Sequence, residues 1–140
     1  MSLSRLLYEW SKKVPTRTFL IGERTLTYEQ ASNEVAFRAS NLSPGMTVAH
    51  IKYNSVDSVL DYLAVFWAGA KVISIDPLTS AEDLRFILED SNPDIVVADK
   101  EIQDREKEVL KGYKVVEKLP ERQVFNKPYD YRDDEVGLVW

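Results

Sequence analysis

Among the side chains whose types could take part in catalysis, the first to consider is His50, the single histidine of the 140-residue chain. It lies in the apolar run TVAHIKY, and no serine or cysteine stands at a motif spacing that would pair it as a general base. Asp76 directly follows the run KVISI, where α/β enzymes often place an acid, although Asp-Pro is also an ordinary turn sequence. We therefore interpret His50 as a hydrogen-bonded packing residue and Asp76 as a turn residue, with base and acid roles as the alternatives.

The remaining acidic residues favour structural roles. Carboxylates near a helix start interact favourably with the helix dipole and repel phosphate, and four of them stand near predicted starts: Asp57, Asp61, Glu82 and Asp83. The run Asp133-Asp134-Glu135 looks like a metal-binding cluster, but three consecutive acids cannot all face one ion, so we favour a solvated loop. The five glycines are scattered singly, which leaves no glycine-rich phosphate loop. We expect no catalytic, cofactor-binding or metal-binding residue within residues 1–140.

Composition and charge narrow the class of protein. A chain of 140 residues is one domain or a piece of a larger one, and 44% hydrophobic with 29% charged residues is ordinary for a globular protein. The net charge of −5 argues against nucleic acid as a partner, which would require a basic face. The sequence has no cysteine, no signal peptide and no apolar run long enough to span a membrane, which predicts a cytoplasmic protein.

Hydrophobic spacing predicts the elements that position these residues. Helices are predicted over residues 3–10, 27–42, 56–67, 79–92 and 101–111, and strands over residues 47–53, 71–76, 94–99, 113–119 and 136–140. The predicted helix caps are Thr27 with Gln30, Asn54 with Ser55, and Thr79 with Glu82. Gly22-Glu23 predicts a two-residue hairpin turn between two further β-rich runs.

This alternation of strands and helices predicts an α/β fold, with a mostly parallel sheet flanked by helices and an N-terminal β-hairpin as an appendage. Such sheets place ligand sites at the carboxyl ends of their strands, which are expected near Tyr53-Asn54, Asp76-Pro77 and Asp99-Lys100.

Several longer stretches carry a resemblance to a known family. In order, they are RTLTYEQASNEVAFRASNL, SPGMTVAHIKYNS, YLAVFWAGAKVISIDP, SAEDLRFILEDSNPDIVVAD and the final DDEVGLVW. Their order and spacing resemble the acyl-adenylate-forming (AMP-binding) superfamily, and most of all its acyl-CoA synthetases. Met46-Thr47 replaces the usual Gly-Asp, Ser74 stands where proline is common, and the stretch after Lys100 has no clear counterpart until the end.

The resemblance implies a function for a longer protein. In that superfamily a carboxylic acid attacks the α-phosphate of Mg-ATP to give an acyl-adenylate, and a thiol such as coenzyme A then takes the acyl group. A phosphate-binding loop is implied directly after DDEVGLVW, so residues 1–140 would form an N-terminal subdomain, a scaffold that ends just before that loop and is inactive alone. ATP, magnesium and coenzyme A are implied for the parent enzyme, and the remainder of the parent chain is the implied partner.

Asn54 matches a polar strand-end residue of the family, and we interpret it as a helix cap. The substitution Asn54→Ala is therefore expected to lower stability more than substrate affinity.

Two other interpretations stay open at this point. The chain could be a free-standing interaction or dimerisation module that pairs through its last strand, including as a homodimer. It could also be an unrelated small α/β nucleotide-binding protein. The sequence leaves the acyl substrate and the thiol acceptor undetermined.

Overall fold

A computed structural model of the chain describes residues 3–20 and 22–130, together with the backbone of Leu138–Val139. The helices are α1 (Leu3–Lys13), α2 (Tyr28–Ala39), α3 (Val56–Trp67), α4 (Ala81–Ser91), α5 (Lys100–Arg105) and α6 (Lys107–Leu110). The strands are β1 (Thr18–Leu20), β2 (Leu26–Thr27), β3 (Thr47–Ile51), β4 (Lys71–Ser74), β5 (Ile95–Ala98), β6 (Val115–Val116) and β7 (Leu138–Val139).

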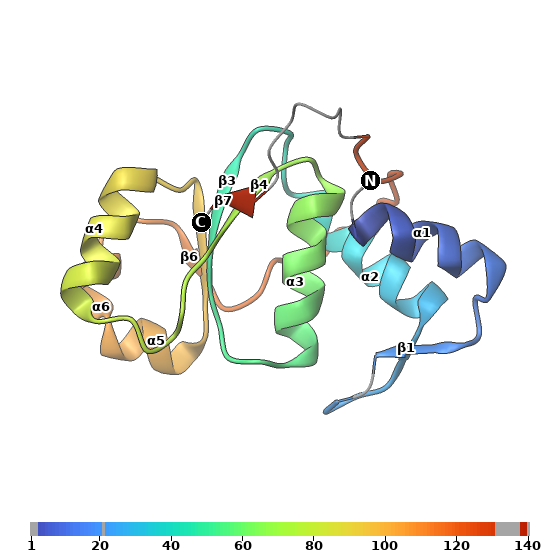
Figure 1. The fold of residues 1–140 in the computed structure, drawn as a ribbon, viewed down its shortest axis with the longest axis horizontal. Coiled ribbons are helices and arrows are strands. Elements are labelled where there is room, and N and C mark those ends of the chain that lie inside the picture. The colour runs from blue at the N-terminus through green and yellow to red at the C-terminus, as the bar shows by residue number, and fades with distance from the viewer. Residues whose placement is uncertain (1–2, 21, 131–137, 140) are drawn as a thin grey trace.

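The centre of the fold is a parallel sheet, which lies near the middle of Figure 1. Its strand order is β6-β5-β3-β4-β7. Every neighbouring pair in this sheet is parallel, and β1 and β2 form a separate antiparallel pair. The predicted α/β fold, with its parallel sheet and N-terminal hairpin, is confirmed.

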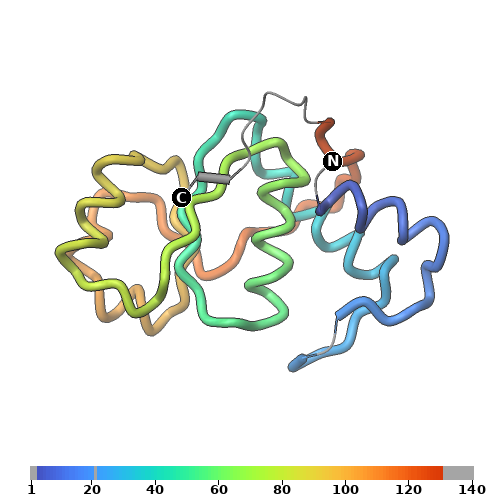
Figure 2. Tube along the Cα trace, viewed as in Figure 1, coloured from blue at the N-terminus to red at the C-terminus, as the bar shows by residue number. Residues whose placement is uncertain are grey.

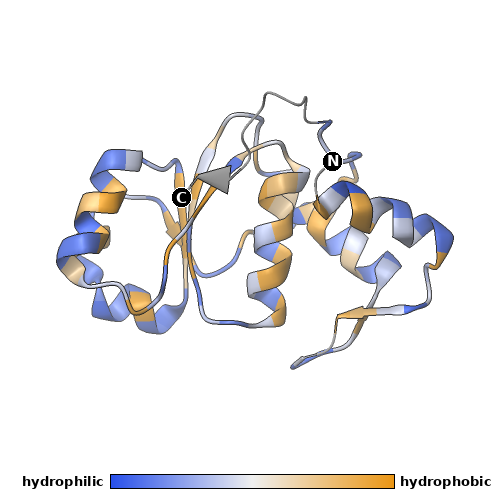
Figure 3. Cartoon of the chain, viewed as in Figure 1, coloured by the Kyte–Doolittle hydropathy of each residue, from blue (hydrophilic) through white to orange (hydrophobic). Residues whose placement is uncertain are grey.

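Helices cover both faces of the sheet (Figure 2). Val48 and Val72 point to the face covered by α1, α2 and α3, whereas Ala49 and Ile73 point to the face covered by α4, α5 and α6. Alternate side chains of each strand therefore enter different cores, as the twofold strand repeat requires. In Figure 3 α3 is apolar over most of its length.

Two of the three predicted helix caps are placed one residue too early. The capping box of Thr27 with Gln30 is confirmed, with both reciprocal hydrogen bonds present. The cap of α3 is Ser55, whose side chain accepts from the Ser58 N–H, so the prediction that Asn54 caps this helix is wrong. Ser80, not Thr79, caps α4 by accepting from the Asp83 N–H. In both cases a serine next to the predicted cap is itself a good N-cap residue.

Other differences concern the extent of the elements. Leu20 pairs with Leu26, so the hairpin connection is longer than the predicted two-residue turn. The predicted helix 101–111 is two helices, because Glu106 has non-helical backbone angles (φ −107°, ψ 30°) between them. The predicted last strand is present over Leu138–Val139 and pairs with β4, while its other residues and Asp133-Asp134-Glu135 lie outside the described residues.

Residues 117–130 are the described part of the connection from β6, at one side of the sheet, to β7, at the other, and we call them the strap. Within the described range the strap contains neither helix nor strand.

Candidate functional site

A cleft opens at the carboxyl ends of β3 and β4. The chain leaves β3 into α3 on one face of the sheet and leaves β4 into α4 on the opposite face. This change of direction is the place where open α/β sheets usually bind ligands. The cleft has a volume of about 580 Å³, and His50, Tyr62, Ser74 and Asp76 are among the residues that line it. Two of the three predicted strand ends, those at Asn54 and Asp76, therefore meet here.

His50 is buried at the inner wall of this cleft. Its Nε2 lies 3.2 Å from the Ser58 carbonyl oxygen and 3.4 Å from Ser58 Oγ, so the imidazole donates to the carbonyl in one tautomer and accepts from the hydroxyl in the other. The Tyr62 ring packs edge-on against the imidazole, with 5.5 Å between ring centroids. Burial lowers the pKa of His50, and the positive charge of Lys52 acts in the same direction. The result is a neutral imidazole held in place by α3, which is the geometry of a packing residue.

Asp76 forms the turn after β4. Its Oδ1 accepts from the Leu78 N–H at 2.8 Å, and its carbonyl oxygen accepts from the Thr79 N–H at 3.0 Å. These bonds hold the Asp-Pro step in a turn, as an aspartate at this position commonly does. The side chain is exposed at the mouth of the cleft.

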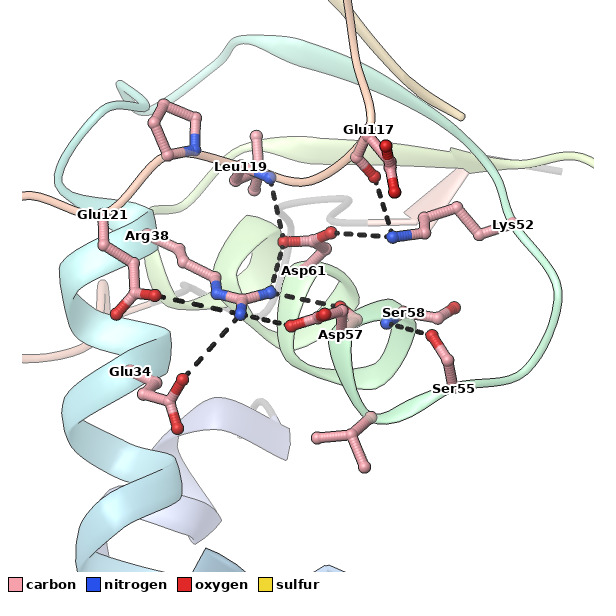
Figure 4. Close-up of polar contacts among 12 residues, drawn as sticks. Glu34, Arg38, Lys52, Ser55, Asp57, Ser58, Asp61, Glu117, Leu119 and Glu121 are labelled. Atoms are coloured by element: carbon pink, nitrogen blue, oxygen red, sulfur yellow. Dashed lines mark hydrogen bonds and ion pairs between the residues drawn. The ribbon is translucent and has the colours of Figure 1, made fainter. Parts of the chain in front are cut away.

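A cluster of buried charges lies on α2, α3 and the residue after β3 (Figure 4), and its Lys52 also lines the cleft. Arg38 Nη1 donates to Asp61 Oδ1 at 2.8 Å, and Arg38 Nη2 donates to Asp57 Oδ1 at 2.6 Å. Lys52 Nζ lies 3.5 Å from Asp61 Oδ2 and donates to the Glu117 carbonyl oxygen at 2.8 Å. The side chains of Arg38 and Asp61 are fully buried, and that of Lys52 is 3% exposed.

Burial and pairing act in opposite directions in this cluster. Burial raises the pKa of Asp61, against the attraction of Arg38 and Lys52. Burial also disfavours the charged form of Arg38, but Asp57 and Asp61 outweigh it and raise the pKa of the guanidinium. For Asp57, which is nearer the surface, burial is outweighed by Arg38 and the pKa is lowered.

This cluster was not predicted from the sequence, although the alternation of side chains along a strand contains a signal for it. Lys52 shares its parity with Val48 and His50, which both face α3, so its side chain follows them inward. The sequence places Asp61 near a helix start, but in the structure it lies in the second turn of α3 among buried residues.

The N-termini of α3 and α4 are unfavourable places for a nucleotide phosphate. The N-termini of α3 and α4 are capped by serines and carry acids in their first turns, which oppose an anion. Within the described ranges no group of three or more histidines and acids is placed to hold a metal ion. The same residues include no helix long and apolar enough to cross a membrane.

Comparison with known proteins gives a family match and more distant structural neighbours. Residues 7–135 match the family described as AMP-binding enzyme. Surfactin synthase subunit 2 of Bacillus subtilis is 34% identical over 103 residues, or 69% of this chain and 3% of that protein. Bacitracin synthase 2 of Bacillus licheniformis is 30% identical over 121 residues, or 82% of this chain and 4% of that protein.

Two solved structures have the same fold at lower identity. The luciferase-like enzyme of the Zophobas morio mealworm superimposes with a TM-score of 0.80 at 19% identity, over 99% of this chain and 39% of that chain. An o-succinylbenzoate CoA synthetase of Bacillus subtilis superimposes with a TM-score of 0.77 at 24% identity, over 96% of this chain and 30% of that chain. The chain therefore spans a small part of the curated relatives and less than two-fifths of these structures.

Proposed function

Because this chain belongs to the AMP-binding enzyme family, we propose that it is the opening subdomain of a longer ligase that activates a carboxylic acid. In this proposal the parent enzyme uses ATP and magnesium to form an acyl-adenylate, and then transfers the acyl group to a thiol. Residues 1–140 supply the scaffold, and the catalytic groups come from the remainder of the parent chain.

The observation that carries this proposal is the position of β7. It pairs in parallel with β4, with Val72 opposite Leu138 and Ile73 opposite Val139. The carboxyl end of β7 is therefore directed to the edge of the sheet where the cleft between β3 and β4 opens. A phosphate-binding loop after β7, as the family resemblance implies, would then stand beside this cleft.

We place the parent among the acid–thiol ligases, with two candidate acceptors. An acyl-CoA synthetase, with coenzyme A as acceptor, is the first, and the o-succinylbenzoate CoA synthetase among the structural neighbours supports it. An adenylation domain that loads an amino acid onto a carrier-bound thiol is the second, and the surfactin and bacitracin synthases support it as the relatives of higher identity. The reducing cytoplasm, where free thiol acceptors persist, is the proposed location.

The test is acid-dependent exchange of pyrophosphate into ATP by the product of the whole gene. We expect exchange with one class within a panel of fatty, aryl and amino acids, and none with the 140-residue chain alone. Adding coenzyme A or a phosphopantetheinylated carrier protein then distinguishes the two acceptors. Absence of exchange with every acid would contradict the proposal and would direct attention to the strand edges as a dimerisation surface.

A further inference from the structure

The strap performs the return that a crossover helix usually performs between parallel strands. At its start, the Glu117 carbonyl oxygen accepts from Lys52, just beyond the carboxyl end of β3. Near its end, the Tyr129 N–H donates to the Trp67 carbonyl oxygen at the C-terminus of α3, shortly before β4 begins. The strap thus returns the chain from the end of the sheet where its strands finish to the opposite end, where β7 must start.

Asp61 joins the strap to the buried charge cluster (Figure 4). Its Oδ1 accepts from the strap's Leu119 N–H at 3.1 Å as well as from Arg38, and its Oδ2 faces Lys52. The Leu119 side chain is 1% exposed and belongs to the core formed with α1, α2 and α3. A shift of the strap by one residue would remove both the apolar contact and the hydrogen bond.

The burial of Asp61 explains why its contact with the strap is specific. A fully buried carboxylate is tolerated when cations and N–H donors surround it, and such groups select one arrangement of the chain more than they add stability. Asp57 provides a contrast on the same helix, because it also binds Arg38 but makes its other hydrogen bond to Arg24 at the surface. Asp61 accepts a hydrogen bond from the strap, whereas Asp57 attracts the charge of the strap's Lys118 and makes its side-chain hydrogen bonds to these two arginines.

We propose that Asp61 is a positioning residue, whose carboxylate fixes the first half of the strap against α3 and so determines where the chain re-enters the sheet as β7. Trp67 fixes the second half, since its Nε1 donates to the Asn126 carbonyl oxygen at 2.7 Å. The consequence for catalysis rests on the proposed function, because a displaced β7 would displace the phosphate-binding loop expected after it.

The test on the chain itself is amide hydrogen exchange followed by NMR in the variants Asp61→Asn and Asp57→Asn. Asparagine has the shape of aspartate and keeps an oxygen that can accept from Leu119, but it lacks the charge that pairs with Arg38 and Lys52. Its NH₂ group would place a second hydrogen-bond donor against the Lys52 ammonium. The reporter amides are Leu119 and Leu138–Val139, and the reference is the Ile75 N–H, bonded to His50 in the sheet centre. In Asp61→Asn we expect the protection of the reporters, relative to the reference, to fall about tenfold or more.

In Asp57→Asn, which removes an attraction to the strap's Lys118 but no hydrogen bond to the strap, we expect the protection of the reporters to fall nearly in step with that of the reference. If the reporters and the reference also lost protection equally in Asp61→Asn, Asp61 would contribute only to global stability and the proposal would be overturned.

A second variant, Trp67→Phe, removes a strap contact and leaves the charge cluster intact. It should lower protection of Leu138–Val139 while Leu119 keeps its protection, and unchanged protection of Leu138–Val139 would contradict the proposal.

In the longer ligase, Asp61→Asn should impair pyrophosphate exchange through the KM for ATP or through kcat while the KM for the acid stays unchanged. Equal shifts of both KM values would argue against a positioning role. If the unmodified ligase lacks exchange, the proposed function fails, while hydrogen exchange on the chain still tests Asp61.

Discussion

The substitution Gly69→Ala tests how tightly the strap is seated at the end of α3. Gly69 lies between α3 and β4 with φ of +77°, a backbone conformation that a residue with a Cβ rarely adopts. A Cβ built there would lie 2.7 Å from both Cδ1 and Cδ2 of the Tyr129 ring in the strap. The alanine variant therefore meets two separate costs, one in its own backbone and one against the strap.

The two costs can be separated with a matched control. The left-handed backbone costs an alanine about 1–2 kcal/mol, and forcing a packed ring aside costs about 1–3 kcal/mol more, so Gly69→Ala should lower the free energy of unfolding by about 2–5 kcal/mol. Gly112 has φ of +91°, and no atom of the described residues lies within 4 Å of a Cβ built there. Gly112→Ala should therefore show only the backbone cost of about 1–2 kcal/mol.

The assay is urea unfolding followed by tryptophan fluorescence, with the free energy of unfolding taken from the midpoint and slope. Combining Gly69→Ala with Tyr129→Ala should reduce the cost of the glycine substitution to that seen at Gly112, since the ring is then absent. Equal losses for Gly69→Ala and Gly112→Ala in the unsubstituted background would refute the close approach of the strap.

Two further predictions concern His50 in the cleft and the N-cap of α3. Because the pKa of His50 is lowered in the folded chain, the unfolded chain binds a proton that the folded chain does not, so the free energy of unfolding should rise with pH in the window below about 6.5. His50→Gln, which can still donate to Ser58, should flatten that rise in urea titrations at successive pH values, and an unchanged slope would contradict the neutral imidazole. Ser55→Ala should lower the free energy of unfolding by about 1 kcal/mol, and Asn54→Ala should have a smaller effect. If calorimetry gave the reverse order, Asn54 would be the cap.

The elements of the fold were largely predictable because their signals are local. The stripe on α3 follows the 3.6-residue repeat, and β3 and β5 are short, nearly continuous buried runs of the kind typical of strands covered on both faces. Caps were predicted less well, since Asn54 and Ser55 are both good N-cap residues and the choice depends on where the backbone turns into the helix.

The buried charge cluster was not predictable from the same signals. Arg38, Lys52 and Asp61 come from three separate elements, and only the packing of α2 against α3 and β3 brings them together. The path of the strap was equally hidden, because a polar stretch without periodicity gives no indication of what it packs against. The position of the cleft was predicted through a topological rule, which needs only the strand ends and the order of elements.

The central claim is that this chain opens a longer adenylate-forming ligase, and the most direct measurement is the sequence of the source gene beyond the codon for Trp140. We predict that the reading frame continues into a loop rich in serine, threonine and glycine, placed to follow β7 at the carboxyl edge of the sheet. A stop codon directly after Trp140 would contradict this account.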